Sequence, residues 1–164
     1  MATSFRTNSR FEWKPRVALC GSMSVYPCVL DQQNCLVSSG VRTIVPDPED
    51  DVAEQMGSRE FDEFKRRVAF AYLRKIRDPR TIAVLAVNCD NHGIANYIGP
   101  NTFAEIAVAF AQGKRIYVFQ QIPAVYEDEL VAWGAVPLGG NLSRLVDDFH
   151  ARCREAEQQL LLFD

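Results

Sequence analysis

Glu105 is the acidic residue of this sequence whose surroundings best suit a chemical role. It follows a long polar segment, residues 88–101, and lies within residues 102–112, where its neighbours are nearly all apolar. Connections between a strand and a helix usually have about two to six residues, and longer ones tend to be functional. We therefore expect the Glu105 carboxylate to lie at the end of a sheet or in a pocket from which water is partly excluded.

A structural role for Glu105 competes with this hypothesis. Thr102 and Glu105 have the spacing of a capping box, in which the glutamate accepts a hydrogen bond at the start of its own helix and contributes about 1 kcal/mol. Asn101 is an alternative N-cap residue, and if it occupies that position Glu105 is free to face a pocket. The free amides at such a helix start could hold a phosphate or a sugar hydroxyl.

The other candidate residues follow predicted strands. The apolar run 16–20 leads into Gly21, Ser22 and Met23, the β-branched run 41–45 leads into Asp47, and the apolar run 82–87 leads into Asp90. Parallel sheets bind ligands at the carboxyl ends of their strands, near the point where the strand order reverses. If these strands are parallel, the three groups of residues lie at the same edge of the sheet.

The order of elements predicts such a sheet. The expected strands are 16–20, 41–45, 82–87 and 115–119, with a short fifth over 135–138. The expected helices are 27–40, 58–77, 102–112 and 142–161, with one more between the last two strands. Alternating strands and helices predict an α/β fold, a single-domain three-layer α/β/α sandwich. Its parallel sheet has four or five strands in a flavodoxin-like or related doubly wound order. Residues 1–15 are expected to form a loose N-terminal arm, and residues 16–164 the single domain.

At these residues the sequence resembles the nucleoside 2-deoxyribosyltransferase superfamily. The most specific stretch is Asn96-Tyr97-Ile98-Gly99-Pro100-Asn101-Thr102-Phe103-Ala104-Glu105-Ile106. The first strand with its Gly21 turn, and residues 111–117 at the end of the following helix, are also similar. The superfamily includes transferases that exchange bases on deoxyribose and hydrolases that cleave the N-glycosidic bond of nucleoside monophosphates. The resemblance covers roughly residues 16–122.

The resemblance implies roles for individual residues. Glu105 takes the position of the nucleophile that attacks the anomeric carbon. The departing base needs a proton, for which Asp47 and Asp90 are the available candidates, since Gly99 stands where the family has an acid. Tyr97 and Met23 would flank the base. The remaining residues, Gly21, Ser22, Gly99, Asn101 and Thr102, would form the sugar or phosphate site.

Composition excludes several other classes of protein. The 164 residues include 18 basic and 21 acidic ones, a formal net charge of −3, whereas nucleic-acid-binding domains are usually basic. The longest aliphatic run has six residues, against about 20 for a membrane span. Neither a P-loop nor a dinucleotide-binding glycine motif occurs. We expect a cytoplasmic protein without metal or cofactor that binds a small nucleoside or nucleotide, and no nucleic-acid polymer or membrane. The resemblance adds a homo-oligomer, a dimer or larger.

Three further groups of residues favour structural roles. The five cysteines lack metal-site spacing and are expected to be buried reduced thiols, with Cys28 and Cys35 on one helical face. His92, between Asn91 and Gly93, is expected in a turn rather than as a catalytic acid. The basic triplet 65–67 is typical of a solvated helix face, with phosphate attraction as the alternative.

Two hypotheses for the function stay open at this point. The first is an enzyme that cleaves the N-glycosidic bond by hydrolysis or base transfer through Glu105. The alternative is a non-catalytic nucleotide-binding or sensing module of the same fold, which the missing acid at Gly99 favours. Within the first hypothesis, a requirement for a 5′-phosphate would separate a monophosphate hydrolase from a base-exchange enzyme.

Overall fold

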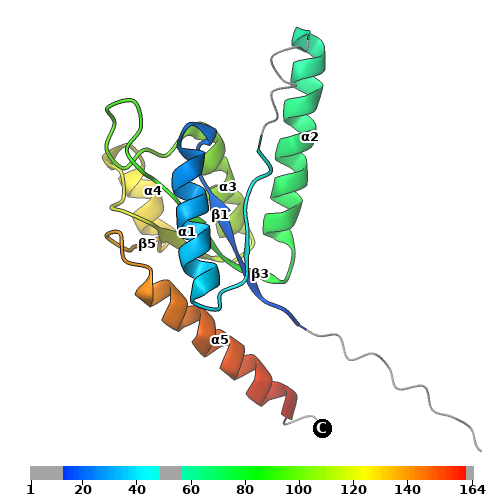
Figure 1. Ribbon diagram of the computed structural model, residues 1–164, viewed down its shortest axis with the longest axis vertical. Helices are drawn as coiled ribbons and strands as arrows, with labels where there is room; N and C mark the ends of the chain where they lie inside the picture. Colours follow the sequence, from blue (N-terminus) through cyan, green and yellow to red (C-terminus); the bar gives the residue numbers. More distant parts are fainter. Residues whose placement is uncertain (1–12, 49–56, 162–164) are drawn as a thin grey trace, which may run out of the picture.

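A single parallel sheet forms the centre of the molecule (Figure 1). The computed structural model describes residues 13–48 and 57–161 of the chain. In these residues five parallel strands pair in the order β2-β1-β3-β4-β5. The strands are β1 (Arg16–Cys20), β2 (Thr43–Ile44), β3 (Thr81–Ala86), β4 (Arg115–Val118) and β5 (Val136–Pro137). This doubly wound order confirms the predicted fold class.

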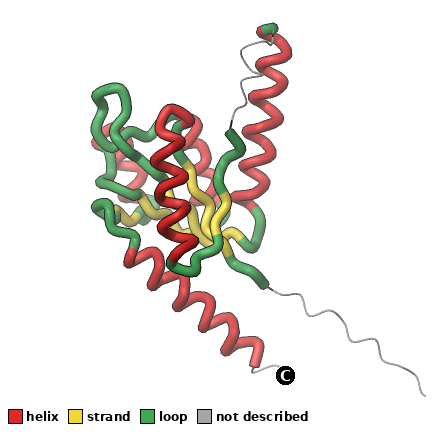
Figure 2. Tube along the Cα trace, in the orientation of Figure 1, coloured by secondary structure: helices red, strands yellow, loops and turns green. Residues whose placement is uncertain are grey.

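The helices cover both faces of the sheet (Figures 1 and 2). Those with a described course are α1 (Tyr26–Ser38), α2 (Ser58–Arg77), α3 (Pro100–Ala111), α4 (Glu127–Ala132) and α5 (Ser143–Leu161). Side chains of α1 and α5 join one core cluster with the sheet. Side chains of α2, α3 and α4 join the other. The result is the predicted three-layer sandwich.

The central strand β3 explains why helices lie on both faces. Successive side chains of a strand point to opposite faces. Leu85 therefore packs with α1 and α5, whereas Val84 and Ala86 pack with α2, α3 and α4. All three are fully buried. An uninterrupted aliphatic run is the pattern expected of a strand buried on both sides.

The start of α3 differs from the prediction and matters for the site. The sequence predicts a helix from Thr102, but α3 begins at Pro100 with Gly99 as its N-cap residue. Proline suits the first helical position because its φ angle is already helical and the amide hydrogen that it lacks has no partner there. Glu105 consequently lies in the second turn of the helix.

The cysteines depart from the prediction of buried reduced thiols. Cys28 and Cys89 form a disulfide, and Cys35 is exposed. The buried residues of α1 are Val29 and Leu36. Each lies one position beyond a cysteine, so the shared face of Cys28 and Cys35 is rotated by about 100° from the buried face. Cys20 is buried with a free thiol, as predicted.

Some predictions fall on residues outside the described ranges. These are most of the N-terminal arm, residues 1–12, and the end of the acidic loop, residues 49–51. In the part of the chain that is described, no helix is long and apolar enough to cross a membrane.

Adjacent residues of α1 provide a matched test of the packing. Leu36 is fully buried and Val37 is 55% exposed. We expect Leu36→Ala to lower the free energy of unfolding by about 2–5 kcal/mol because it leaves a cavity in the core. Val37→Ala should change it by less than about 0.5 kcal/mol. Chemical denaturation measures both values, and equal effects would contradict the assigned faces of α1.

Candidate functional site

A cavity of about 310 Å³ lies at the carboxyl ends of β1 and β2, beside α2 and α3. It brings together the sequence-predicted site residues except Asp90. These are Gly21, Ser22, Met23, Asp47, Tyr97, Gly99, Asn101, Thr102 and Glu105. The position agrees with the general rule for parallel sheets, because β1 and β3 are adjacent and their following helices, α1 and α3, cover opposite faces.

The turn after β1 has room only for glycine in its present packing. A Cβ atom at Gly21 would lie 2.7 Å from Cγ2 of Val29 and 3.3 Å from the carbonyl oxygen of Val87. The backbone therefore passes closely between α1 and the end of β3, which brings Ser22 and Met23 to the cavity.

Glu105 lines the cavity, and its carboxyl group has a clearly shifted pKa. Burial raises its pKa to about 7 from the ordinary 4.5, while a hydrogen bond from the Cys20 thiol lowers it. Burial disfavours the charged form because protein groups solvate an anion less well than water does. At neutral pH the residue thus exchanges between protonated and ionised forms. Strongly shifted groups in a cavity are characteristic of functional sites.

Cys20 and Tyr72 are buried side chains that interact with Glu105. Cys20 is fully buried at the end of β1, and both burial and the nearby Glu105 raise the pKa of its thiol. Tyr72 projects from α2, and its hydroxyl donates a hydrogen bond to the carbonyl oxygen of Leu19. Burial raises the pKa of this phenol as well. The Tyr72 hydroxyl therefore uses its proton in a hydrogen bond to the backbone of β1.

The geometry of α3 decides against the capping box. In a capping box the glutamate is the third helical residue, and the N-cap side chain bonds to its amide. Here Gly99 is the N-cap and makes no side-chain cap hydrogen bond. Thr102 is the third residue and Glu105 the sixth. Neither predicted N-cap, Asn101 or Thr102, occupies that position, and Glu105 lines the cavity.

The two candidate proton donors lie in different places. Asp47 lines the cavity, but its carboxylate is 77% exposed and 2.9 Å from the Lys75 ammonium group. Asp90 is exposed and accepts a hydrogen bond from the Asn96 amide at 3.0 Å, away from the residues that line the cavity. Asp47 is therefore the candidate with access to a bound molecule. His92 is exposed in a turn with φ 50°, as predicted.

Sequence reasoning missed the contribution of α2. Five of its residues line the cavity: Lys65, Val68, Ala69, Tyr72 and Leu73. Their spacing of three and four residues was the available signal, because it places them on one side of a helix. The three residues of the basic triplet therefore lie in different environments. Lys65 is half-buried at the cavity, whereas Arg66 and Arg67 are exposed.

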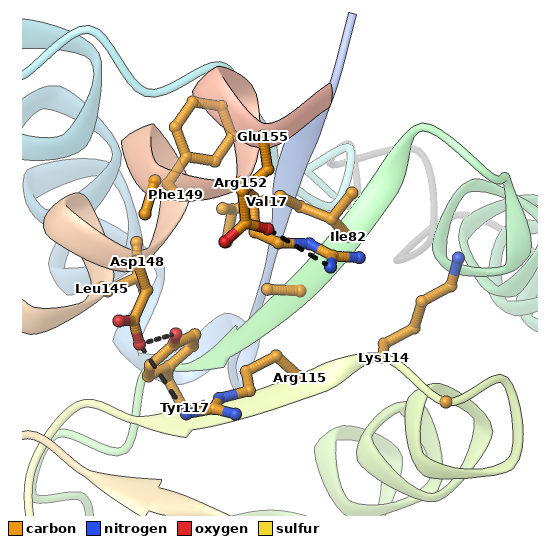
Figure 3. Close-up of a pocket in the computed structure, with 13 residues that line it drawn as sticks. Val17, Ile82, Lys114, Arg115, Tyr117, Leu145, Asp148, Phe149, Arg152 and Glu155 are labelled. Atoms are coloured by element: carbon orange, nitrogen blue, oxygen red, sulfur yellow. Dashed lines mark hydrogen bonds and ion pairs between the residues drawn. The ribbon is translucent and has the colours of Figure 1, made fainter. Parts of the chain in front are cut away.

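A second cavity of about 400 Å³ lies at the other end of the sheet, between α5 and the starts of β1, β3 and β4 (Figure 3). Several of its polar side chains bind one another: the Tyr117 hydroxyl donates to Asp148 at 2.6 Å, and Arg152 lies 3.9 Å from Glu155. It contains none of the residues that the sequence singles out for chemistry. We therefore assign the candidate site to the cavity at Glu105.

Within the described ranges, no cluster of three or more histidine, cysteine, aspartate or glutamate side chains could hold a metal ion. No family model matches this chain, and searches of curated proteins and of solved structures find no match.

Glu105 should make stability depend on pH. Between about pH 4.5 and pH 7 the folded protein holds a proton that the unfolded chain releases, so the stability of the wild type falls as pH rises through this window. Glu105→Gln cannot ionise. We expect its free energy of unfolding, relative to the wild type, to rise by about 3 kcal/mol across the window.

Urea denaturation at several pH values measures this difference. Asp31→Asn, at an exposed position on α1, controls for the removal of one negative charge. A difference between Glu105→Gln and the wild type that stays constant with pH would contradict the desolvated state of Glu105.

Proposed function

We propose that this chain cleaves the N-glycosidic bond of a nucleoside or a nucleoside 5′-monophosphate, with Glu105 as the nucleophile. The observation that carries the proposal is a desolvated carboxyl, with a pKa of about 7, on the wall of a cavity at the carboxyl ends of parallel strands. The cavity volume of about 310 Å³ is at the lower end of the range for small-molecule sites. The resemblance of residues 96–106 to the nucleoside 2-deoxyribosyltransferase superfamily supports the same residue in the same role.

A carboxylate suits this reaction because the transition state carries positive charge on the sugar. An ionised Glu105 oxygen attacks the anomeric carbon as the bond to the base breaks, and the electron pair of that bond passes to the base nitrogen. Water then attacks the same carbon in hydrolysis, or a second base does so in transfer. Either step releases Glu105 as a carboxylate.

The departing base gains a proton, and Asp47 is the candidate donor. It is the second carboxylate among the residues that line the cavity. Its carboxylate lies 2.9 Å from the Lys75 ammonium group, and donation to the base requires that this side chain exchange a proton with solvent. The exposure of Asp47 allows that exchange.

The remaining cavity residues suit the parts of a nucleotide. Tyr97 and Met23 offer an aromatic ring and a thioether, which pack well against a planar base. Ser22, Asn101 and Thr102 offer polar groups for sugar or phosphate oxygens. Asn101 and Thr102 lie in the first turn of α3, where amide groups and the helix dipole favour an anion.

A second candidate function is a nucleotide-binding or sensing module without catalysis. The pairing of Asp47 with Lys75 and the position of Asp90 outside the cavity favour it, because one carboxylate is bound by an ammonium group and the other does not line the cavity. This hypothesis predicts that nucleotides raise the melting temperature without release of free base. Asn101→Ala would abolish that shift.

The homo-oligomer implied by the resemblance remains a proposal. Phe70 on α2 is 60% exposed and Phe61 is 37% exposed. Nine residues separate the two side chains, which places them on opposite sides of the helix, so the proposal of an oligomer rests on the resemblance alone.

Replacement of Glu105 should abolish base release. We expect Glu105→Ala and Glu105→Gln to reduce the rate at least about a thousandfold, because the covalent step loses its nucleophile. Glu60→Gln, at an exposed position of α2, should leave the rate unchanged. Chromatography of free base after incubation with a panel of nucleosides and their monophosphates measures the rates. Undiminished activity in Glu105→Ala would eliminate the proposed role.

Activity should also follow the ionisation of Glu105. The nucleophile must be ionised, so kcat/KM should increase about tenfold per pH unit below pH 7 and become constant above it. A profile that is flat from about pH 5 to pH 8 would mean that a different group limits the reaction.

A further inference from the structure

The disulfide between Cys28 and Cys89 joins two segments that lie next in sequence to residues of the candidate site. Cys28 is the third residue of α1, directly after the turn that brings Ser22 and Met23 to the cavity. Cys89 lies near the start of the β3–α3 connection, residues 87–99, which ends in the cavity residues Tyr97 and Gly99. The two cysteines are 61 residues apart in sequence, and their Cα atoms are 6.8 Å apart.

We propose that Cys28 and Cys89 are a reversible oxidation site that exchanges with small thiols and disulfides of the glutathione type. In its oxidised form the pair fixes the β3–α3 connection against α1. The proposal is independent of the catalytic role assigned to Glu105.

Accessibility and position suit both cysteines to this exchange. Both side chains are half-buried, so small reagents reach them, whereas Cys20 is fully buried. Cys28 lies in the first turn of the 13-residue helix α1, where the positive end of the helix dipole favours a thiolate.

Two hydrogen bonds link Asn91, close to Cys89 in sequence, with the cavity residue Ser22. Asn91 follows Cys89 by two residues, and its amide group donates to the Ser24 hydroxyl at 2.7 Å. The Ser24 and Ser22 hydroxyls are also 2.7 Å apart, and Ser22 lines the cavity. The covalent bond is thus accompanied by one hydrogen bond between the β3–α3 connection and the turn that precedes α1. Reduction of the disulfide therefore removes the only covalent one of these contacts.

The backbone of the β3–α3 connection indicates that it depends on such links. His92 and Asn96 have φ angles of 50° and 54°, in the left-handed region that costs non-glycine residues energy. Residues 92–95 are exposed and contribute nothing to the buried core. Contacts to neighbouring segments, including the disulfide, therefore hold this conformation in place.

Oxidation of the two cysteines by glutathione disulfide takes place in two successive thiol–disulfide exchange steps. The Cys28 thiolate attacks one sulfur of a glutathione disulfide, which forms a mixed disulfide and releases one glutathione thiolate. The Cys89 thiolate then attacks the Cys28 sulfur and releases the second. Two protein thiols are oxidised, one glutathione disulfide is reduced to two thiols, and the two protons from the cysteines pass to the released glutathione.

Redox titration of the full chain tests the proposal. The protein is equilibrated in glutathione buffers of increasing oxidised fraction, and free thiols are then alkylated. Mass spectrometry quantifies the peptide pair linked through Cys28 and Cys89. Amide hydrogen exchange of residues 88–97 is measured on the same samples. The variants are Cys28→Ser and Cys89→Ser, with Cys35→Ser, an exposed cysteine on the same helix, as the matched control.

We expect the linked pair to form in one transition and to dissociate again in reduced glutathione. Exchange of residues 88–97 should slow about tenfold with the same transition, since the link stabilises that segment against local opening. Cys35→Ser should behave like the wild type, and Cys89→Ser should stay in the fast-exchanging state. If Cys28→Ser fails to fold, the reduced wild type and Cys89→Ser provide the same comparison.

Three results would overturn the proposal. The first is that both thiols stay free at every buffer ratio. The second is a bond that persists in reduced glutathione, as a structural disulfide would. The third is hydrogen exchange of residues 88–97 that does not change when the bond forms. None of these measurements uses base release, so the outcome is separate from that of the proposed function.

Discussion

The two neighbouring strands β1 and β3 are buried on both faces, and the arrangement of the helices follows from that constraint. Leu19 and Leu85 need cover on one side of the sheet, and Ala18 and Val84 need it on the other. Helix α1 covers one face of these strands, and α2 and α3 cover the opposite face. Because the crossovers reverse direction between β1 and β3, the loops after these strands diverge, and the cavity forms beside them.

The same packing sets the chemistry of Glu105. Helix α3 is anchored through Ile106, which is fully buried in the core cluster shared with Tyr72 of α2 and Cys20 of β1. Glu105 precedes Ile106, so its side chain lies at the border between this apolar cluster and the cavity. Burial there raises the pKa of the carboxyl to about 7. The environment that stabilises the fold thus keeps this carboxyl poorly solvated.

Patterns along the chain carried enough information for the fold and for most of the candidate site. The aliphatic run 82–87 and the glycine after β1 reflect burial and close packing, which act locally on residue choice. The start of α3 was misplaced because Thr102 and Glu105 imitate a capping box, whereas Pro100 determines the first turn. The contribution of α2 and the Cys28–Cys89 bond depend on how distant segments meet, and spacing within one segment does not encode that.

The central claim is that Glu105 is a desolvated carboxyl in its native environment, and titration of its side-chain carbon by NMR spectroscopy measures this directly. Selective ¹³C labelling of glutamate, with Glu105→Gln to assign the signal, gives the pKa of this one group in the folded protein. We expect a midpoint at about pH 7. A midpoint near the ordinary 4.5 would show a solvated carboxylate and contradict the account.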